Sequence, residues 1–279
     1  MTVERRLLHI SDIHFGPKHL PEVSEGIAAL VERDRPDLVV ISGDLTQRAK
    51  AKQFREARAF VERLERTAPS IAVPGNHDVP LWRVWERLFA PYRVWRRHFG
   101  RELEPVYRDP ALLVVGINSS QAFAFKGGRV RSRRVREVER LLAEAAHEQF
   151  RIVVAHHHLA RPDGIECEHP SWGALTAANR LAPGGVDLVL SGHLHQTLEL
   201  YPAGPDGFPA LHTGTSSSSR GRGPEAGRNT AHWIEVDGET FRVKGLLWTP
   251  GSAGGEGHGR FEPFFERSYP RHVRRPAER

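Results

Sequence analysis

Five short polar clusters are the part of this sequence that could do chemistry, and each directly follows an apolar run. In chain order they are Asp12-Ile13-His14, Gly43-Asp44, Gly75-Asn76-His77-Asp78, His156-His157-His158 and Gly192-His193-Leu194-His195. Taken singly, each is compatible with an ordinary turn or cap, because glycine permits positive φ and aspartate or asparagine caps a backbone. Together they supply carboxylate, amide and imidazole groups, which is a donor set suited to divalent metal ions.

The number of these groups predicts two metal ions rather than one, because a catalytic ion usually keeps about three protein ligands and an open position. Alternate residues of a strand face the same side, so Asp12 with His14, and His193 with His195, each aim at one point if the strand ends stay extended. Two ions about 3.5–4 Å apart can activate water and hold the oxygens of a displacement at phosphorus. The candidate ligands are Asp12, His14, Asp44, Asn76, His156, His193 and His195.

The elements that must position these groups alternate between strands and helices. Strands are expected at 6–10, 38–41, 71–73, 112–117, 152–155 and 188–190, with helices at 23–33, 49–66 and 132–146. This alternation predicts an α/β protein with a largely parallel sheet, and ligands bind at the carboxyl ends of such strands. Later in the chain, antiparallel strands are expected at 198–201, 231–236 and 241–247. Asp237-Gly238, between the last two, is typical of a hairpin turn.

Two segments depart from this pattern. Residues 80–108 are rich in aromatic residues and arginine and are predicted to form two short helices inserted after the third strand, either packed on the body or capping the substrate. Packing on the body is favoured. If the insert instead faced a nucleotide, a base could stack on the aromatic side chains of Trp82, Trp85, Tyr92 and Trp95, and the phosphate could be attracted by Arg83, Arg93, Arg96 and Arg97. Residues 1–250 are expected to form the domain, and 251–279 a Gly/Arg-rich extension in which Phe261, Phe264 and Phe265 could dock.

Composition excludes several classes of protein. The 279 residues carry a net charge of +6 and include a single cysteine, Cys167, so neither a disulfide framework nor a Cys-rich zinc module is possible. No apolar stretch approaches the length of a membrane span, and a cytoplasmic protein is expected. The basic residues are spread along the chain rather than gathered in one stretch, so nucleic acid is not the expected partner.

The five motifs, in order D-x-H, G-D, G-N-H-D, H and G-H-x-H, resemble the calcineurin-like metallophosphoesterase superfamily from about residue 7 to about residue 195. The resemblance implies a four-layer α/β/β/α sandwich with a binuclear metal centre at the strand ends. It also assigns the ligands: Asp12, His14 and His195 to one ion, Asn76, His156 and His193 to the other, with Asp44 bridging. The ions expected from these donors are Mn, Fe or Zn.

The same resemblance implies that Asn76 and His77 face the substrate and that His77 is catalytic. An imidazolium at that point can neutralise or protonate the leaving alkoxide, and the adjacent Asp78 is expected to orient its ring. In the histidine run, His156 is preferred as the ligand and His157 is the alternative, since a shift of one residue turns the side chain to the other face.

The amino-acid sequences of the motifs look most like those of the bacterial class III cyclic-nucleotide and glycerophosphodiester phosphodiesterase branch. The expected function is therefore hydrolysis of a small phosphodiester by metal-activated hydroxide. Three alternatives remain open: a nuclease of the same superfamily, a hydrolase of a nucleotide-sugar-lipid pyrophosphate, and a non-catalytic scaffold, which would be expected to lose ligands. The partner is expected to be a small phosphoester, and a homo-oligomer is left open.

Overall fold

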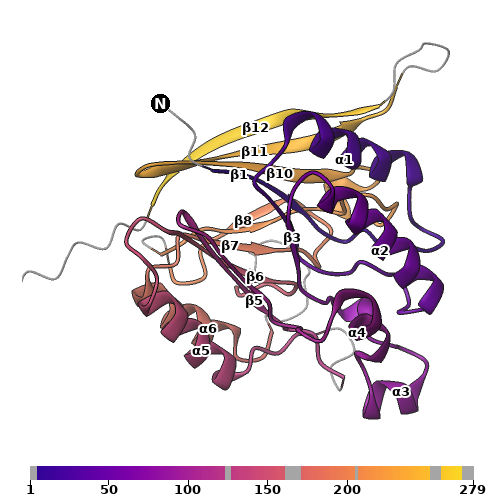
Figure 1. Cartoon of the computed structure of the whole chain (residues 1–279), viewed down its shortest axis with the longest axis horizontal. Helices are drawn as coiled ribbons and strands as arrows, with labels where there is room; N and C mark the ends of the chain where they lie inside the picture. The colour runs from indigo at the N-terminus through magenta and orange to yellow at the C-terminus, as the bar shows by residue number, and fades with distance from the viewer. Residues whose placement is uncertain (1–4, 123–126, 161–170, 205–206, 252–258, 272–279) are drawn as a thin grey trace, which may run out of the picture.

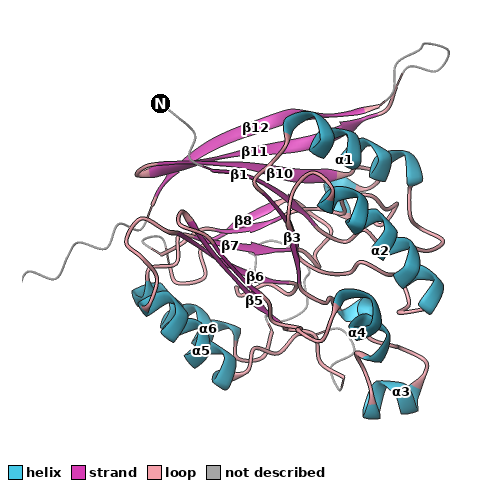
Figure 2. Cartoon of the chain, viewed as in Figure 1, coloured by secondary structure: helices cyan, strands magenta, loops and turns pink. Residues whose placement is uncertain are grey.

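The computed structural model describes residues 5–122, 127–160, 171–204, 207–251 and 259–271, so Cys167 lies outside the described residues. Two six-stranded sheets face each other, and helices cover the outer face of each sheet (Figure 1). Figure 2 shows the same layers by type, with the cyan helices outside the magenta strands on both sides. The molecule is therefore the four-layer α/β/β/α sandwich that the resemblance implies.

The first sheet has the strand order β12-β11-β10-β1-β2-β3. β1, β2 and β3 pair in parallel, and β10, β11 and β12 extend the sheet from β1 in antiparallel fashion. The sheet is thus mixed. Its part from β1 to β3 is parallel, as the alternation of strands and helices predicts, and the antiparallel strands expected at 231–236 and 241–247 are β10 and β11. Its strands are β1 (Arg5–Ile10), β2 (Leu38–Ile41), β3 (Ser70–Ala72), β10 (Thr230–Asp237), β11 (Thr240–Thr249) and β12 (Arg260–Pro270).

The second sheet has the strand order β4-β5-β6-β7-β9-β8, with parallel pairing from β5 through β9 and an antiparallel strand at each edge. The carboxyl ends of its parallel strands share one edge, which is where ligands gather in such sheets. Its strands are β4 (Val106–Arg108), β5 (Leu112–Ile117), β6 (Phe150–Ala155), β7 (Leu188–Ser191), β8 (Leu198–Leu200) and β9 (Ala210–His212).

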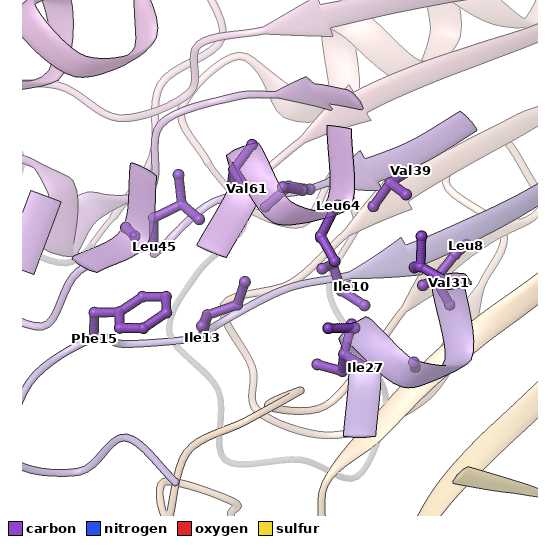
Figure 3. Close-up of a cluster of buried hydrophobic side chains, with 14 of the residues drawn as sticks. Leu8, Ile10, Ile13, Phe15, Ile27, Val31, Val39, Leu45, Val61 and Leu64 are labelled. Carbon is purple, nitrogen blue, oxygen red and sulfur yellow. The ribbon is translucent and has the colours of Figure 1, made fainter. Parts of the chain in front are cut away.

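Three apolar cores hold the layers together. One lies between the first sheet and helices α1 and α2, where residues such as Ile27 and Leu64 pack on Ile10 (Figure 3). A second lies between the two sheets, and a third between the second sheet and α5 and α6. The helices are α1 (Pro21–Asp34), α2 (Ala51–Glu65), α3 (Val84–Phe89), α4 (Arg93–Phe99), α5 (Ser132–Ala143) and α6 (Ala174–Leu181), with 3-10 turns η1 (Asn76–Asp78), η2 (Ala182–Gly184) and η3 (Gly223–Glu225).

The insert after β3 contains the two short helices that were expected, and they differ in packing. On α4, Trp95 is 1% exposed and packs against Phe54 of α2, so this helix belongs to the core. Around α3, Trp82 is 79% exposed and Trp85 75% exposed. Packing on the body therefore describes α4 but not the aromatic side chains of α3.

The boundary expected at residue 250 is wrong for part of the chain, because residues 260–270 form β12, which pairs with β11 over its whole length. Phe265 packs on Gly245, where a Cβ would lie 2.0 Å from its ring, and Phe261 is buried in the first core. The signal was weak because β12 is an edge strand in which most residues are exposed and two, Pro263 and Pro270, are prolines. Of the segment assigned to an extension, residues 252–258 and 272–279 lie outside the described residues.

None of the helices in the described ranges is long and apolar enough to cross a membrane.

Candidate metal centre

The predicted ligands lie at strand ends whose backbone turns sharply instead of staying extended. Positive φ angles occur at Asp12 (53°), His14 (54°), Asp44 (52°), His193 (70°) and His195 (56°). Among the described residues that are not glycine, Arg35 and Ala49 are the other two with positive φ. The extended geometry assumed for the paired ligands is therefore wrong, and left-handed turns bring the side chains together. Such strained backbone is concentrated at functional sites.

Three side chains converge in a first cluster at the ends of β1 and β7. The His195 Nε2 atom lies 3.0 Å from Asp12 Oδ1 and 3.2 Å from His14 Nε2. His14 Nε2 is itself 3.5 Å from Asp12 Oδ1. All three side chains are buried, so one carboxylate and two imidazoles share a small volume away from bulk water.

A second cluster gathers an amide and two imidazoles from β3, β6 and β7. The side-chain oxygen of Asn76 lies 3.1 Å from His156 Nε2 and 3.0 Å from His193 Nδ1. The sequence reasoning grouped the same three residues. Their donor atoms point at one another across three strand ends.

Asp44 lies between the two clusters. Its Oδ2 atom is 3.7 Å from His14 Nε2 in the first cluster and 3.3 Å from His156 Nε2 in the second. Its Oδ1 atom accepts a hydrogen bond of 2.7 Å from the backbone N–H of His77. One carboxylate oxygen therefore faces both groups of ligands while the other is held by the backbone.

Two glycines leave the space that this arrangement needs. A Cβ on Gly75 would lie 2.1 Å from Asp44 Oδ1, and a Cβ on Gly43 would lie 2.7 Å from the His156 ring. Gly43 also has φ +105°, a conformation that side chains rarely adopt. The glycines of the G-D and G-N-H-D motifs are thus explained by close approach to the ligands.

The imidazole orientations are fixed by the ring nitrogens that do not face the clusters. His156 Nδ1 donates a 2.8 Å hydrogen bond to the carbonyl oxygen of Ser42, and His195 Nδ1 donates a 2.7 Å bond to that of Arg220. These bonds place a proton on each Nδ1 and direct each Nε2 toward its cluster. Metal-bound histidines are oriented by such bonds.

His77 is held beside the clusters by a backbone group and not by the neighbouring aspartate. Its Nδ1 atom donates a 2.8 Å hydrogen bond to the carbonyl oxygen of Gln47. Asp78 instead accepts hydrogen bonds from the backbone N–H groups of Gly75 and Thr46, at 2.9 and 2.8 Å. The expectation that Asp78 orients the His77 ring is therefore wrong, and Asp78 shapes the loops that carry Asp44 and Asn76.

A cavity of about 550 Å³ opens over this centre. Its lining combines candidate ligands with His77, apolar residues and arginines. The lining residues are Asp44, Gln47, Arg48, Asn76, His77, Val79, Leu81, His193, His195, Arg220 and Arg222.

Comparison with known families decides what kind of centre this is. Residues 5–197 match the family described as calcineurin-like phosphoesterase. The chain belongs to this family. The match contains all five motifs and both clusters, and it makes the chain a metal-dependent phosphoester hydrolase.

Curated relatives of this calcineurin-like phosphoesterase carry phosphodiesterase names. The 3',5'-cyclic adenosine monophosphate phosphodiesterase CpdA of Escherichia coli strain K12 is 28% identical over 211 residues, which are 70% of this chain and 71% of CpdA. The glycerophosphodiester phosphodiesterase GpdQ of Enterobacter lignolyticus is 35% identical over 82 residues, 26% of this chain and 29% of GpdQ. The chain thus spans less than a third of GpdQ.

Solved structures show the same fold at low identity. A purple acid phosphatase from yellow lupin superposes with a TM-score of 0.70 at 13% identity, over 95% of this chain and 53% of the plant protein. A dimetal phosphatase from Danio rerio gives a TM-score of 0.62 at 12% identity, over 88% of this chain and 96% of that protein. Both likenesses concern the fold.

The centre of this calcineurin-like phosphoesterase fits divalent ions by its own chemistry. The buried oxygens Asp12 Oδ1 and Asp44 Oδ2 have no hydrogen-bond partner among the described residues. Unpartnered buried carboxylate oxygens are costly unless a cation or a donor meets them. Oxygen and imidazole nitrogen in this mixture are the donors that borderline divalent ions prefer.

Burial and charge divide the protonation states within the centre. Burial lowers the pKa of His14 to about 4, so this ring is neutral at physiological pH and its lone pair is available. Burial acts in the same direction on His156, but the Asp44 carboxylate outweighs it and raises the His156 pKa to about 9. Burial would raise the pKa of Asp44, but His156 and His77 outweigh it and lower that pKa. Asp44 is therefore an anion that cations hold in place.

The choice between His156 and His157 follows from their partners. His156 Nε2 faces Asp44 and Asn76, whereas His157 Nδ1 lies 2.9 Å from the Ser119 hydroxyl. His157 still belongs to a group of three close histidines with His156 and His193. Its ring packs against those of both His156 and His193, so His157 stays the alternative ligand.

Sequence reasoning missed the arginines of the cavity. Arg220 and Arg222 follow β9, a short parallel strand that the sequence pattern does not predict, so no signal placed the loop at its carboxyl end beside the ligands. Of the arginines proposed instead, Arg83 and Arg93 both pair with Glu86. Tyr92 and Trp95 are buried and cannot stack on a base, whereas Trp82 and Trp85 are exposed.

Proposed function

We propose that this calcineurin-like phosphoesterase is a binuclear phosphodiesterase that hydrolyses small phosphodiesters of the cyclic-nucleotide or glycerophosphodiester kind. Mn, Fe or Zn ions suit its donors. The proposed ligands are Asp12, His14 and His195 for one ion, and Asn76, His156 and His193 for the other, with Asp44 shared. Asn76 and His77 are the proposed substrate-facing residues, and His77 is the proposed catalytic one.

The observation that carries the proposal is the position of Asp44. Its Oδ2 atom lies within 3.7 Å of a ring nitrogen in each cluster and has no hydrogen-bond partner among the described residues. A buried carboxylate between two separate ligand groups is the arrangement that two neighbouring cations require. A single-ion site would leave one of the two clusters without a role.

Divalent ions held here supply positive charge that polarises a phosphate and lowers the pKa of water. The chain itself positions the groups around the reaction. Asp44 Oδ1 receives the His77 N–H, so the shared carboxylate and the substrate-facing histidine are held in fixed relation. With Nδ1 bound to Gln47, His77 directs Nε2 to the cavity, beside Arg220. Burial and the charges of Arg220 and Arg48 lower the His77 pKa despite the Asp44 carboxylate, so the ring must take up a proton before it can protonate the departing oxygen.

The substrate class is supported by the two named relatives, one acting on cyclic adenosine monophosphate and the other on glycerophosphodiesters. A cavity of about 550 Å³ is within the range of small-molecule sites, roughly 300–1,000 Å³. Small diesters are therefore preferred over polymers as the proposed substrates.

The decisive experiment is one substrate panel with Mn²⁺-loaded protein. It compares bis(p-nitrophenyl) phosphate, 3',5'-cyclic AMP, a glycerophosphodiester, p-nitrophenyl phosphate and DNA. Faster turnover of the small diesters supports the proposal. Preference for DNA with steep salt dependence points to a nuclease, detergent-dependent cleavage of a nucleotide-sugar-lipid pyrophosphate points to a lipid hydrolase, and metal-loaded protein without any activity points to a scaffold.

A further inference from the structure

Three arginines surround the part of the cavity that lies over His77. Arg48 and Arg220 are half-buried, and Arg222 is exposed at the mouth. None of the three forms a salt bridge with a carboxylate of the described residues. Elsewhere in the fold arginines are commonly paired, as Arg58 is with Glu62 and Arg63 with Glu25.

Two of these guanidinium groups contact the His77 ring from opposite sides. The Arg220 Nη2 atom lies 3.3 Å from His77 Nε2, and the Arg48 Nη1 atom lies 3.4 Å from His77 Nδ1. Both cations therefore lie beside the proposed leaving-group residue.

The backbone that carries Arg220 and Arg222 is tied to the metal centre. The Arg220 carbonyl oxygen accepts the Nδ1–H of His195 at 2.7 Å, and the Arg222 N–H donates to the His195 carbonyl oxygen at 3.3 Å. The two guanidinium groups are thus held at a fixed place relative to the centre. They do not belong to a freely moving surface loop.

The three cations repel one another, and Arg220 is partly desolvated as well. Burial lowers the pKa of Arg220, the Asp44 and Asp12 carboxylates raise it, and the like charges of Arg222 and Arg48 lower it. A guanidinium binds a phosphate strongly through paired N–H donors. The unpaired arrangement therefore favours an anionic ligand that supplies the missing partner.

The scissile phosphate alone does not account for three guanidinium groups. A phosphodiester carries one negative charge, and in the proposed function its oxygens meet Asn76, His77 and the ions. The three arginines add three further positive charges to the lining of the cavity. A substrate with a second anionic group would match this excess of positive charge.

We propose that Arg48, Arg220 and Arg222 form a second anion subsite, which binds a phosphate carried by the substrate in addition to the scissile diester. This inference rests on the proposed function and narrows its substrate class. Among small phosphodiesters, the preferred class is one that bears another phosphate within about one nucleotide of the scissile diester, so a cyclic nucleotide or glycerophosphodiester with such a phosphate should be hydrolysed faster than one without it.

The test uses three dinucleotides that share the same scissile bond: TpT, its 5'-phosphorylated form pTpT and its 3'-phosphorylated form TpTp. With Mn²⁺-loaded protein, kcat/KM for one of the phosphorylated forms is expected to exceed that for TpT at least about tenfold, because a charge-assisted phosphate contact contributes about 1.5–3 kcal/mol. In Arg48→Gln and Arg222→Gln proteins this ratio is expected to fall toward one. Arg228→Gln, which removes an exposed arginine of the same segment outside the cavity, is the matched control and keeps the ratio.

A second measurement does not depend on catalysis. Calorimetric titration of metal-free protein with inorganic pyrophosphate is expected to show binding that Arg48→Gln and Arg222→Gln weaken about tenfold each and that Arg228→Gln leaves unchanged. Equal kcat/KM for the three dinucleotides overturns the subsite and leaves the proposed phosphodiesterase standing. If none of the dinucleotides is cleaved, the substrate panel above still tests the proposed function, and the titration alone decides on the subsite: arginine-dependent binding supports it, and absence of binding overturns it.

Discussion

The Nδ1 atom of His77 donates its proton to the backbone carbonyl oxygen of Gln47, at 2.8 Å. Gln47 lies three residues beyond Asp44, in the loop that connects β2 to α2. The loop that places the shared carboxylate therefore also sets the ring orientation of the proposed catalytic histidine. Because the acceptor is a main-chain atom, no side-chain substitution at Gln47 removes this contact.

We expect His77→Ala to lower kcat for bis(p-nitrophenyl) phosphate by about 10²–10⁴-fold, because a positioned proton donor contributes that much. Metal content should stay at the wild-type ratio, since the His77 side chain is not among the proposed ligands. Steady-state kinetics and elemental analysis of the same sample measure both. His147→Ala, an exposed histidine between α5 and β6, is the control. A His77→Ala protein with unchanged kcat would remove His77 from the mechanism.

Much of the fold was predictable because its signals are local. The strands that precede the candidate ligands are apolar runs followed by a short polar cluster. The helix expected at 132–146 shows apolar residues on one face and is observed as α5 over Ser132–Ala143. The elements that were missed have weak local signals. β9 has three residues, and β12 is an exposed edge strand stabilised by its pairing with β11.

The identities of the candidate ligands were predictable from their motifs, but the contacts around them were not. The left-handed turn at Asp12 and the contact between His77 and Gln47 depend on loops from different strands. Arg220 lies 143 residues from His77 along the chain, yet its guanidinium contacts the ring. No pattern within one segment reports such a distant pairing.

Asp44→Asn should reduce the number of bound ions from two toward one. The amide keeps the shape of the side chain but removes the negative charge that faces both clusters. We expect metal affinity to fall by about 10–100-fold or more, with a parallel loss of diester hydrolysis. Elemental analysis after dialysis against limiting Mn²⁺ gives the ratio of metal to protein. Asp237→Asn, in the β10–β11 hairpin, is the control, and two tightly bound ions in the Asp44→Asn protein would argue against a shared carboxylate.

Gly75→Ala should displace Asp44, because the added Cβ would lie 2.1 Å from Asp44 Oδ1 and 2.3 Å from its backbone nitrogen. We expect weaker metal binding, loss of hydrolysis and a destabilisation of about 1–3 kcal/mol, the range for overpacking. Gly127→Ala provides the comparison, since a Cβ there meets nothing within 4 Å. Both proteins are compared by urea unfolding and elemental analysis. Equal behaviour of the two would mean that the β3–η1 turn relaxes without moving Asp44.

Acid should destabilise the fold through a buried histidine of β10. Burial lowers the pKa of His232 from 6.5 to about 4. Above pH 6.5 the ring is neutral in both states and contributes nothing, whereas between pH 6.5 and 4 the unfolded chain binds a proton that the folded protein does not. The free energy of unfolding therefore falls as the pH falls, by about 2 kcal/mol between pH 7 and 5 from this residue.

Replacing His232 by glutamine removes this proton linkage, so the loss of stability between pH 7 and 5 should be smaller by about 2 kcal/mol. Urea unfolding of metal-free protein at the two pH values measures it, and working without metal avoids the pH dependence of the ligands. His147→Gln, at an exposed position, should keep the wild-type dependence. An unchanged pH dependence in the His232→Gln protein would show that this ring titrates normally in the fold.

The two helices of the insert offer a test with one residue type in two environments. Trp95 of α4 is 1% exposed, and its ring packs against Phe54 and Phe99 with centroid separations of 6.2 and 4.9 Å. Trp85 of α3 is 75% exposed, although its ring stacks on Phe89.

We expect Trp95→Ala to cost about 3–5 kcal/mol of unfolding free energy, the range for a large core side chain. Trp85→Ala should change it by about 0.5 kcal/mol or less, as exposed positions do. Urea unfolding of both proteins makes the comparison. A large cost at Trp85 would contradict the assignment of the α3 aromatics to the surface, and a small cost at Trp95 would mean that α4 is not anchored to α2 through this ring.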